Sequence, residues 1–196
     1  MPKSKKSSKK TSKKKKQQKA VGFRLDRSLG FLVVGLVMVV FSLGWSFYRQ
    51  RILSFDIVPT EVLDRGGELP VEVRISKVNI NLPIEESGIM DGVWQISYDG
   101  ASHLNTSAKL GEGGNVVLYG HNRNTLLGPI RWLNVGDIVE VVAMNGDIYK
   151  YRVGETVTTT PDDISYVLPK NEEMLTIYTC TNFLDRDRFV IVAKPI

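Results

Sequence analysis

The chain has 196 residues, which suits one membrane anchor and one domain of ordinary size, so we expect a single folded unit. Its formal charge is +5, but residues 1–20 contain ten lysines and no acidic residue, and subtracting those ten charges leaves −5 for the rest of the chain. The only cysteine is Cys180, which excludes an intramolecular disulfide and leaves the domain to be held together by its core.

Residues 1–27 form a lysine-rich tail that is too polar to bury a core, so we predict it to be disordered. Runs of lysine can bind nucleic acid by neutralising phosphates. However, residues 1–20 contain no aromatic residue for base stacking, and an apolar span follows the tail directly. We therefore predict a cytoplasmic tail close to the membrane, and no nucleic-acid partner.

Residues 28–48 are predicted to be a single transmembrane helix. From Leu29 to Tyr48 the chain carries no charge, and twenty helical residues roughly match the ~30 Å hydrocarbon core of a bilayer. A cleaved signal peptide is the alternative, but its apolar region usually has about 7 to 15 residues and ends at a small-x-small site. Here the span ends with Trp45 and Phe47, which fit an interfacial aromatic belt. With the lysines inside, the rest of the protein is expected to be extracytoplasmic.

Residues 49–70 contain Pro59, the pair Gly66-Gly67 and Pro70 without a sustained period, which is typical of a linker or of a strap over a domain surface. The folded domain is therefore predicted to cover residues 71–196.

This domain contains mostly strand signals and no convincing long amphipathic helix, although we expect a short helix at Ser102–Lys109. The pair Asn145-Gly146 predicts a type I′ hairpin turn, because these residues tolerate positive φ angles. The predicted strands are Val71–Ile80, Asn115–Tyr119, Ile138–Met144, Asp147–Val153, Met174–Thr179 and Arg188–Ala193. A barrel is the most economical arrangement of such strands, because closure removes the open edges of a sheet.

Two reactive side chains follow predicted strands. Cys180 comes at the end of the run that begins at Met174, and His121 follows the run that begins at Asn115. Side chains leave the core where a strand ends, so both are placed where a substrate can reach them. A thiol nucleophile needs a group that shuttles protons and a donor that holds the oxyanion. The sequence offers two histidines for the first role, His103 and His121.

Three motifs in order resemble those of sortases. The first is Gly-Asn-x-Val-Leu-x-Gly-His, which ends here at His121; the second is Leu-Thr-x-x-Thr-Cys, which ends at Cys180. The third is an arginine that opens an apolar strand ending in Val-Ala, here Arg188 to Ala193. The resemblance covers roughly residues 70–196. It implies an all-β fold, an eight-stranded barrel with short helices, and an amino-terminal transmembrane helix that holds the enzyme outside the cell membrane.

The resemblance also implies a chemistry. Cys180 would attack the threonine carbonyl of a sorting signal similar to Leu-Pro-x-Thr-Gly (LPxTG) and form a thioester, while His121 protonates the leaving amine. A second amine would then resolve the thioester. Arg188 would donate to the oxyanion or to bound peptide carbonyls, a role that suits its planar fork and permanent charge. Thr179 would contribute a hydrogen bond near the thiolate, as a substrate-binding residue.

The implied partners are secreted proteins with an LPxTG-like signal and an amine acceptor, such as a cell-wall precursor or a pilin lysine. No cofactor and no metal are predicted. The acidic pairs Glu85-Glu86, Asp162-Asp163 and Glu172-Glu173 are interpreted as solvated, because adjacent side chains in a strand point to opposite faces.

Other readings of the site remain as alternatives. A papain-like protease carries its cysteine before its histidine, whereas His121 precedes Cys180 here. An L,D-transpeptidase places glycine directly before the cysteine, whereas Thr179 stands there. A catalytically inactive sortase-like binding or scaffold protein is a further alternative, and the presence of all three reactive residue types argues against it.

Overall fold

The structure is a computed structural model that describes residues 27–52, 66–90, 92–182 and 185–196. The lysine-rich tail, apart from residue 27, and most of the linker predicted at residues 49–70 lie outside these ranges.

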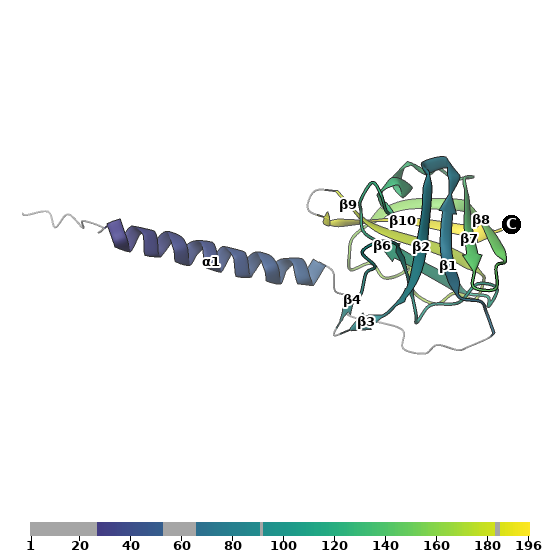
Figure 1. Ribbon diagram of the computed structural model, residues 1–196, viewed down its shortest axis with the longest axis horizontal. Coiled ribbons are helices and arrows are strands. Elements are labelled where there is room, and N and C mark those ends of the chain that lie inside the picture. Colours follow the sequence, from purple (N-terminus) through teal and green to yellow (C-terminus); the bar gives the residue numbers. More distant parts are fainter. Residues whose placement is uncertain (1–26, 53–65, 91, 183–184) are drawn as a thin grey trace, which may run out of the picture. The chain divides into compact units, whose positions relative to one another are not determined.

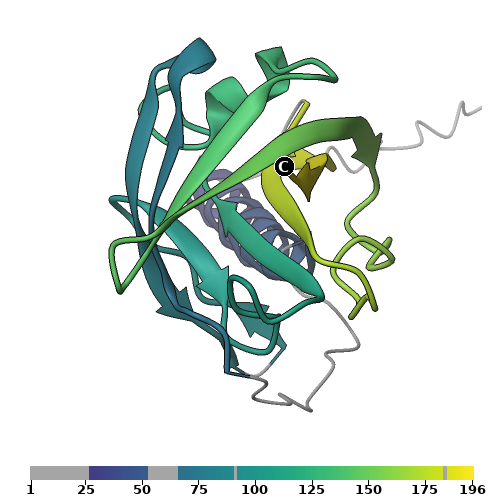
Figure 2. The same cartoon turned by 90° about the vertical axis from the view of Figure 1, so that its right-hand side faces the viewer.

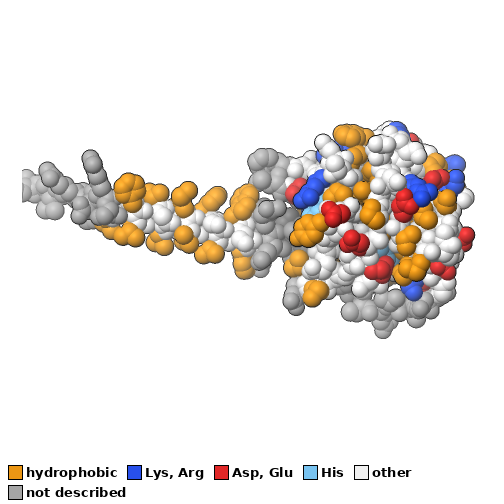
Figure 3. Space-filling view, viewed as in Figure 1, with side chains coloured by type: hydrophobic (Ala, Val, Ile, Leu, Met, Phe, Trp, Pro, Cys, Tyr) orange, Lys and Arg blue, Asp and Glu red, His pale blue; other side chains and the backbone are white. Residues whose placement is uncertain are grey.

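Helix α1 (Arg27–Ile52) contains the predicted anchor. Its segment Leu29–Phe47 has a mean hydropathy of 2.2 and is long and apolar enough to cross a membrane. Its apolar side chains project from the helix without packing in a core, and Phe31 and Leu32 are 78% and 71% exposed (Figure 3). A helix of this length that is apolar all around is consistent with a single-pass anchor.

Residues 70–195 contain a closed eight-stranded barrel, as predicted (Figures 1 and 2). Its strands follow one another around the wall in the order β1-β2-β5-β6-β9-β10-β8-β7, and pairing of β1 with β7 closes it. Their bounds are β1 Pro70–Ile75, β2 Ile80–Ser87, β5 Ala101–Leu104, β6 Asn115–Gly120, β7 Ile138–Ala143, β8 Ile148–Thr159, β9 Met174–Thr181 and β10 Asp187–Pro195. The pairs β2–β5 and β6–β9 are parallel, and the other neighbours are antiparallel.

Small elements fill the connections. A two-stranded sheet of β3 (Ile89–Met90) and β4 (Val93–Trp94) lies in the connection between β2 and β5. The short 3₁₀ helix η1 (Ser76–Val78) follows β1, and a second one, η2 (Gly128–Trp132), precedes β7.

The barrel wall is buried on both faces around β6 and β9. One face packs into the large interior core, to which Val116 and Ile177 belong. The other face carries a second cluster, in which Val117 and Tyr178 pack with Trp94 from the β2–β5 connection. Strands buried on both faces are mainly apolar and do not alternate between apolar and polar residues. This explains why both strands are recognisable in the sequence as short, mainly apolar runs without a charged residue.

Two predictions of secondary structure were wrong, one of a strand and one of a helix. The run Val71–Ile80 is not one strand, because η1 and the left-handed Asn79 (φ 54°) turn the chain between β1 and β2. The helix predicted at Ser102–Lys109 does not form. Its first three residues belong to β5, where they are buried and pair with β2 and β6. Tertiary packing thus overrides local preference at this position.

The hairpin between β7 and β8 forms at the predicted place but with another turn. Gly146 has a φ of 91°, whereas Asn145 is not among the residues with positive φ. The N–H of Gly146 donates to the carbonyl of Ala143 at 2.9 Å, and the N–H of Ala143 donates to Asp147 at 2.8 Å. This is the pattern of a type I turn followed by a left-handed glycine, so the predicted type I′ turn is wrong.

Candidate active site

Three neighbouring strands bring the predicted reactive residues together. Gly120, the last residue of β6, is in register with Thr179 of β9, so the next residues along these parallel strands are His121 and Cys180. On the other side of β9, Cys180 is the direct partner of Arg188 in β10. Cys180 therefore lies on the middle strand, with His121 following one neighbouring strand and Arg188 on the other.

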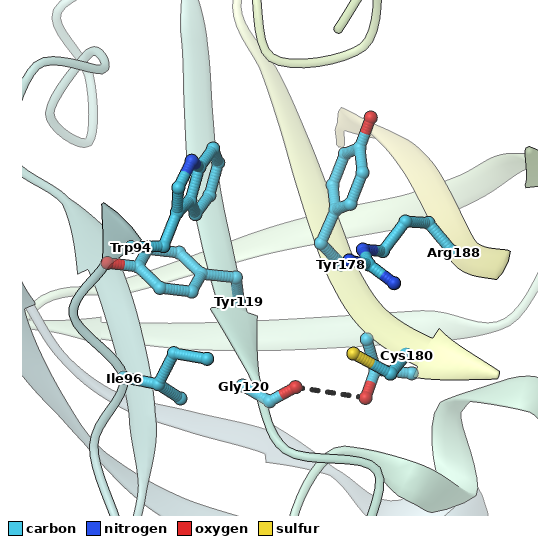
Figure 4. Close-up of a pocket in the computed structure, with 8 residues that line it drawn as sticks. Trp94, Ile96, Tyr119, Gly120, Tyr178, Cys180 and Arg188 are labelled. Carbon is cyan, nitrogen blue, oxygen red and sulfur yellow. Dashed lines mark hydrogen bonds between the residues drawn. The ribbon is translucent and has the colours of Figure 1, made fainter. Parts of the chain in front are cut away.

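Cys180 lines a pocket on the outer face of the barrel wall (Figure 4). The pocket encloses about 360 Å³ of space, part of it open to solvent. Its walls are mostly aromatic and aliphatic, and the residues that line it are Trp94, Ile96, Tyr119, Gly120, Tyr178, Thr179, Cys180 and Arg188. The half-buried position raises the pKa of the thiol, and the charge of Arg188 opposes this rise.

Arg188 is buried, with 4% of its surface exposed, and lines the same pocket as Cys180 (Figure 4). Its Nη1 donates to the carbonyl oxygens of Asp185 at 2.9 Å and Asp187 at 3.2 Å. These bonds hold the guanidinium at the base of the loop that joins β9 to β10. A fixed positive fork beside the thiol is suited to stabilising negative charge that develops there.

His121 is half-buried and begins the loop after β6. It is not among the residues that line the pocket, although Gly120 directly before it is. The ring of Tyr98 lies beside it, with 6.0 Å between ring centroids. Burial lowers the pKa of the imidazole, Arg123 lowers it further, and Asp185 acts in the opposite direction. The neutral imidazole that results is able to accept a proton.

Thr179 borders the pocket, but its side chain is buried and its hydroxyl donates to the carbonyl of Gly120 at 3.0 Å (Figure 4). This bond joins β6 to β9 one residue before His121 and Cys180. In this arrangement the hydroxyl proton is directed to the main chain, so the observed contribution of Thr179 is to hold the two strand ends in register.

The other histidine occupies a different environment. His103 is 1% exposed, and its Nδ1 pairs with the Oε1 atom of Glu86. Its Nε2 lies 3.1 Å from the carbonyl of Ala108 and 3.1 Å from Ser107 Oγ. Both ring nitrogens thus have partners within the protein, which is the environment of a structural histidine.

The acidic pairs are engaged in ordinary contacts. Glu86 pairs with His103, Asp163 accepts from the Thr159 hydroxyl at 2.7 Å, and Glu173 accepts from Tyr151 at 2.8 Å. Within the part of the chain that the structure describes, no three His, Cys, Asp or Glu side chains gather in a group that could hold a metal ion.

The pocket walls were not predicted from the sequence. Tyr119 and Tyr178 lie in strands where an aromatic residue indicates a core position equally well, and both also pack in the second cluster. Trp94 and Ile96 come from a connection without a periodic pattern. The available signal was one tyrosine two residues before His121 and another two residues before Cys180.

Comparisons with known proteins agree with this architecture. The family model described as the sortase domain matches residues 73–196. The chain therefore belongs to the sortase family. It is similar to a sortase D5 transpeptidase of Clostridium perfringens, with 30% identity and a TM-score of 0.55 over 65% of this chain and 78% of that one.

Two further solved structures have the same fold. Sortase C1 of Streptococcus agalactiae is 28% identical, with a TM-score of 0.53 over 70% of this chain and 72% of that one. Sortase A of Listeria monocytogenes is 23% identical, with a TM-score of 0.55 over 66% of this chain and 88% of that one. A comparison with curated proteins gave no match.

Proposed function

We propose that this protein is a membrane-anchored cysteine transpeptidase that cleaves an LPxTG-like sorting signal and transfers the acyl part to an amine. The observation that carries the proposal is the position of Cys180. It lines the pocket, it lies in β9 beside β6, the strand that His121 follows, and it pairs with Arg188 of β10. The relative from C. perfringens, at 30% identity, is described as a transpeptidase.

In the first step the proton of the Cys180 thiol passes to neutral His121, and the thiolate attacks the threonine carbonyl of the signal. A C–S bond forms while the carbonyl oxygen takes up negative charge, which the Arg188 guanidinium stabilises. The C–N bond to glycine then breaks, and the imidazolium gives its proton to the departing amine. The products are a thioester on Cys180, a free glycine amine and neutral His121.

In the second step an amine attacks the thioester and His121 accepts its proton. The C–S bond breaks, an amide bond forms, and the proton returns from His121 to the Cys180 thiolate. Every proton that leaves one group arrives at another and no electrons are gained or lost, so the cycle needs no oxidant.

The apolar pocket supplies the binding surface. Trp94, Ile96, Tyr119 and Tyr178 form walls that suit the apolar residues of an LPxTG-like signal. The acceptor amine is a cell-wall precursor or a pilin lysine. Residues 28–48 anchor the protein as a single pass, residues 1–27 form the cytoplasmic tail, residues 49–70 are the linker and residues 71–196 form the extracytoplasmic domain.

The test is intact-mass spectrometry of the full chain in detergent with an LPxTG peptide, first alone and then with hydroxylamine as the acceptor. We expect an acyl adduct on Cys180 that hydroxylamine converts to a peptide hydroxamate. The Cys180→Ala variant, which loses the attacking sulfur but little volume, should fold normally and give neither product. A stable adduct on another residue, or turnover by this variant, would refute the assignment. A correctly folded chain that forms no adduct with any peptide of a sorting-signal library would favour a scaffold role.

A further inference from the structure

A short turn directly before β5 is held to the barrel by buried groups. The N–H of Ser97 donates to Ser102 Oγ at 2.8 Å, and Ser97 Oγ accepts from the N–H of Gly100 at 3.1 Å. Ser97 and Ser102 are both buried. Gly100 packs so closely on β2 that a Cβ atom at this position would lie 2.3 Å from the carbonyl oxygen of Pro83. Both ends of the turn are therefore fixed.

The tip of this turn presents an aromatic side chain to solvent. Tyr98 lies between Ser97 and Gly100, and its exposed fraction of 76% is the highest among the large hydrophobic residues that the structure describes after residue 65. A single exposed aromatic residue is common on protein surfaces. Tyr98, however, lies beside His121, with 6.0 Å between the ring centroids and 36° between the ring planes. Its position relative to the proposed base is what calls for an explanation.

Tyr98 also continues a segment that borders the pocket. Ile96 and Trp94, two and four residues earlier in the chain, line the pocket across from Cys180 (Figure 4). The same segment then reaches the ring of His121 through Tyr98. It therefore borders both the pocket proposed to bind the acyl part of the signal and the exposed space beside the proposed base.

The proposed reaction places an amine beside His121 in both of its steps. The leaving amine takes a proton from the imidazolium, and the acceptor amine gives a proton to the neutral imidazole, so each comes within hydrogen-bond reach of this ring. His121 is not among the residues that line the pocket. The chain that carries the amine is thus expected outside the pocket, on the side of His121 where Tyr98 is exposed.

We propose that Tyr98 forms a binding surface for the chain that carries the acceptor amine, and that it thereby favours aminolysis of the thioester over hydrolysis. This inference rests on the proposed function. An aromatic ring packs against the carbon atoms next to an amine and attracts its ammonium form, so it concentrates the acceptor beside His121. Because the turn is fixed at both ends, little conformational freedom is lost on binding. The surface suits primary amines on a flexible chain, such as a peptide amino terminus or a lysine side chain.

The test measures how the thioester on Cys180 partitions between an amine and water. The full chain in detergent is incubated with an LPxTG peptide and increasing triglycine, and the triglycine and free-acid products are quantified by mass spectrometry. Their ratio depends only on steps after the thioester, so slower acylation or a smaller folded fraction does not change it. Hydroxylamine serves as a second acceptor, because it has no carbon chain to contact the ring.

We expect Tyr98→Ala to lower the ratio of triglycine product to free acid roughly 3- to 10-fold, the effect of losing one aromatic contact, and to leave the hydroxylamine ratio unchanged. Tyr98→Phe keeps the ring and should restore the parent ratio. The matched control is Trp132→Ala, which removes another exposed aromatic ring, one that packs with Arg131 at 5.3 Å from the ring centroid. This control should leave both ratios unchanged.

Three results would overturn the proposal. The triglycine ratio could stay at the parent value in Tyr98→Ala, or it could fall as far in Trp132→Ala. The triglycine and hydroxylamine ratios could also fall equally in Tyr98→Ala, which would show that the ring acts on His121 or on water access and does not bind the acceptor. A parent chain that forms no thioester would instead refute the proposed function, and this inference with it.

Discussion

Cys180 and Arg188 are direct partners across the antiparallel pair β9–β10, and both line the same pocket. Residues that face each other in an antiparallel pair project from the same side of the sheet, so the register alone puts the guanidinium on the same side as the thiol. The hydrogen bonds from Nη1 to Asp185 and Asp187 then set its orientation. One arginine thus links the proposed nucleophile to the loop that follows it.

Replacement of this arginine by lysine should be severe. An ammonium on a flexible stem cannot reproduce the planar fork, so Arg188→Lys should lower kcat by roughly 10²- to 10³-fold, the typical effect of removing one oxyanion donor. The control is Arg186→Ala, since Arg186 is exposed in the same loop and should remain within a few-fold of the parent. Both are measured by steady-state cleavage of a fluorogenic signal peptide. Equal losses of activity in the two variants would show that the donor role has been assigned to the wrong residue.

Replacing the two histidines should have different effects: one substitution should lower activity and the other should lower stability. His121→Ala should reduce turnover by roughly 10²- to 10⁴-fold, because proton transfer is lost, and should leave the midpoint of thermal unfolding nearly unchanged. His103→Ala removes a buried ring and leaves Glu86 and the Ala108 carbonyl without this partner, so it should cost about 2 to 4 kcal/mol of stability. Its folded fraction should turn over normally. An inactive but stable His103→Ala would reverse this assignment.

The thiol should react slowly with alkylating agents at neutral pH. Burial raises the pKa of Cys180 above the ordinary value of 9.0, so its thiolate fraction at pH 7 lies below that of an unperturbed cysteine. The alkylation rate with iodoacetamide should therefore keep rising above pH 9. Because the charge of Arg188 lowers the pKa of this thiol, Arg188→Ala should move the profile to still higher pH. A titration midpoint of the Cys180 thiol at or below that of the glutathione thiol would show that burial does not raise its pKa.

Much of the fold could be predicted from the sequence, because the decisive strands have an unusual pattern. Strands β6 and β9 are buried on both faces, and their mainly apolar runs without a charged residue are conspicuous next to the polar loops. The connection between β2 and β5 could not be predicted, because it has no period of its own. The conformation of this connection depends on tertiary contacts. One of them is the edge-on packing of the Trp94 ring against the Tyr119 ring, with 4.5 Å between the ring centroids.

The proposed site also has a part that could be predicted from the sequence and a part that could not. Cys180, His121 and Arg188 are reactive residue types in recognisable motifs, so their positions at strand ends could be predicted. The pocket could not, because its walls join two strands with a distant connection.

The anchor prediction concerns α1. The intact protein should sediment with membranes and be released by detergent but not by high salt, since Leu29–Phe47 is long and apolar enough to span a bilayer. Protease added outside intact cells should digest the barrel and spare an epitope fused before Met1. A released mature form that begins after residue 48 would instead indicate a cleaved signal peptide.

The last prediction concerns the pocket wall. The Tyr119 hydroxyl donates to the Gln95 carbonyl at 2.6 Å, in the connection that also carries Trp94 and Ile96. Tyr119→Phe removes this bond and should cost about 1 kcal/mol of stability. Because it loosens a wall of the pocket but leaves the reactive groups in place, it should raise KM for the signal peptide several-fold and change kcat little.

A matched control lies inside the barrel. Tyr151 is fully buried, and its hydroxyl donates to Glu173 at 2.8 Å, but it does not line the pocket. Tyr151→Phe should therefore lose a similar amount of stability without a change in KM. Comparing the two variants at a temperature well below both unfolding midpoints separates a local effect on the pocket from general destabilisation. If KM rises equally in both, or if Tyr119→Phe lowers kcat alone, the connection does not shape the binding surface.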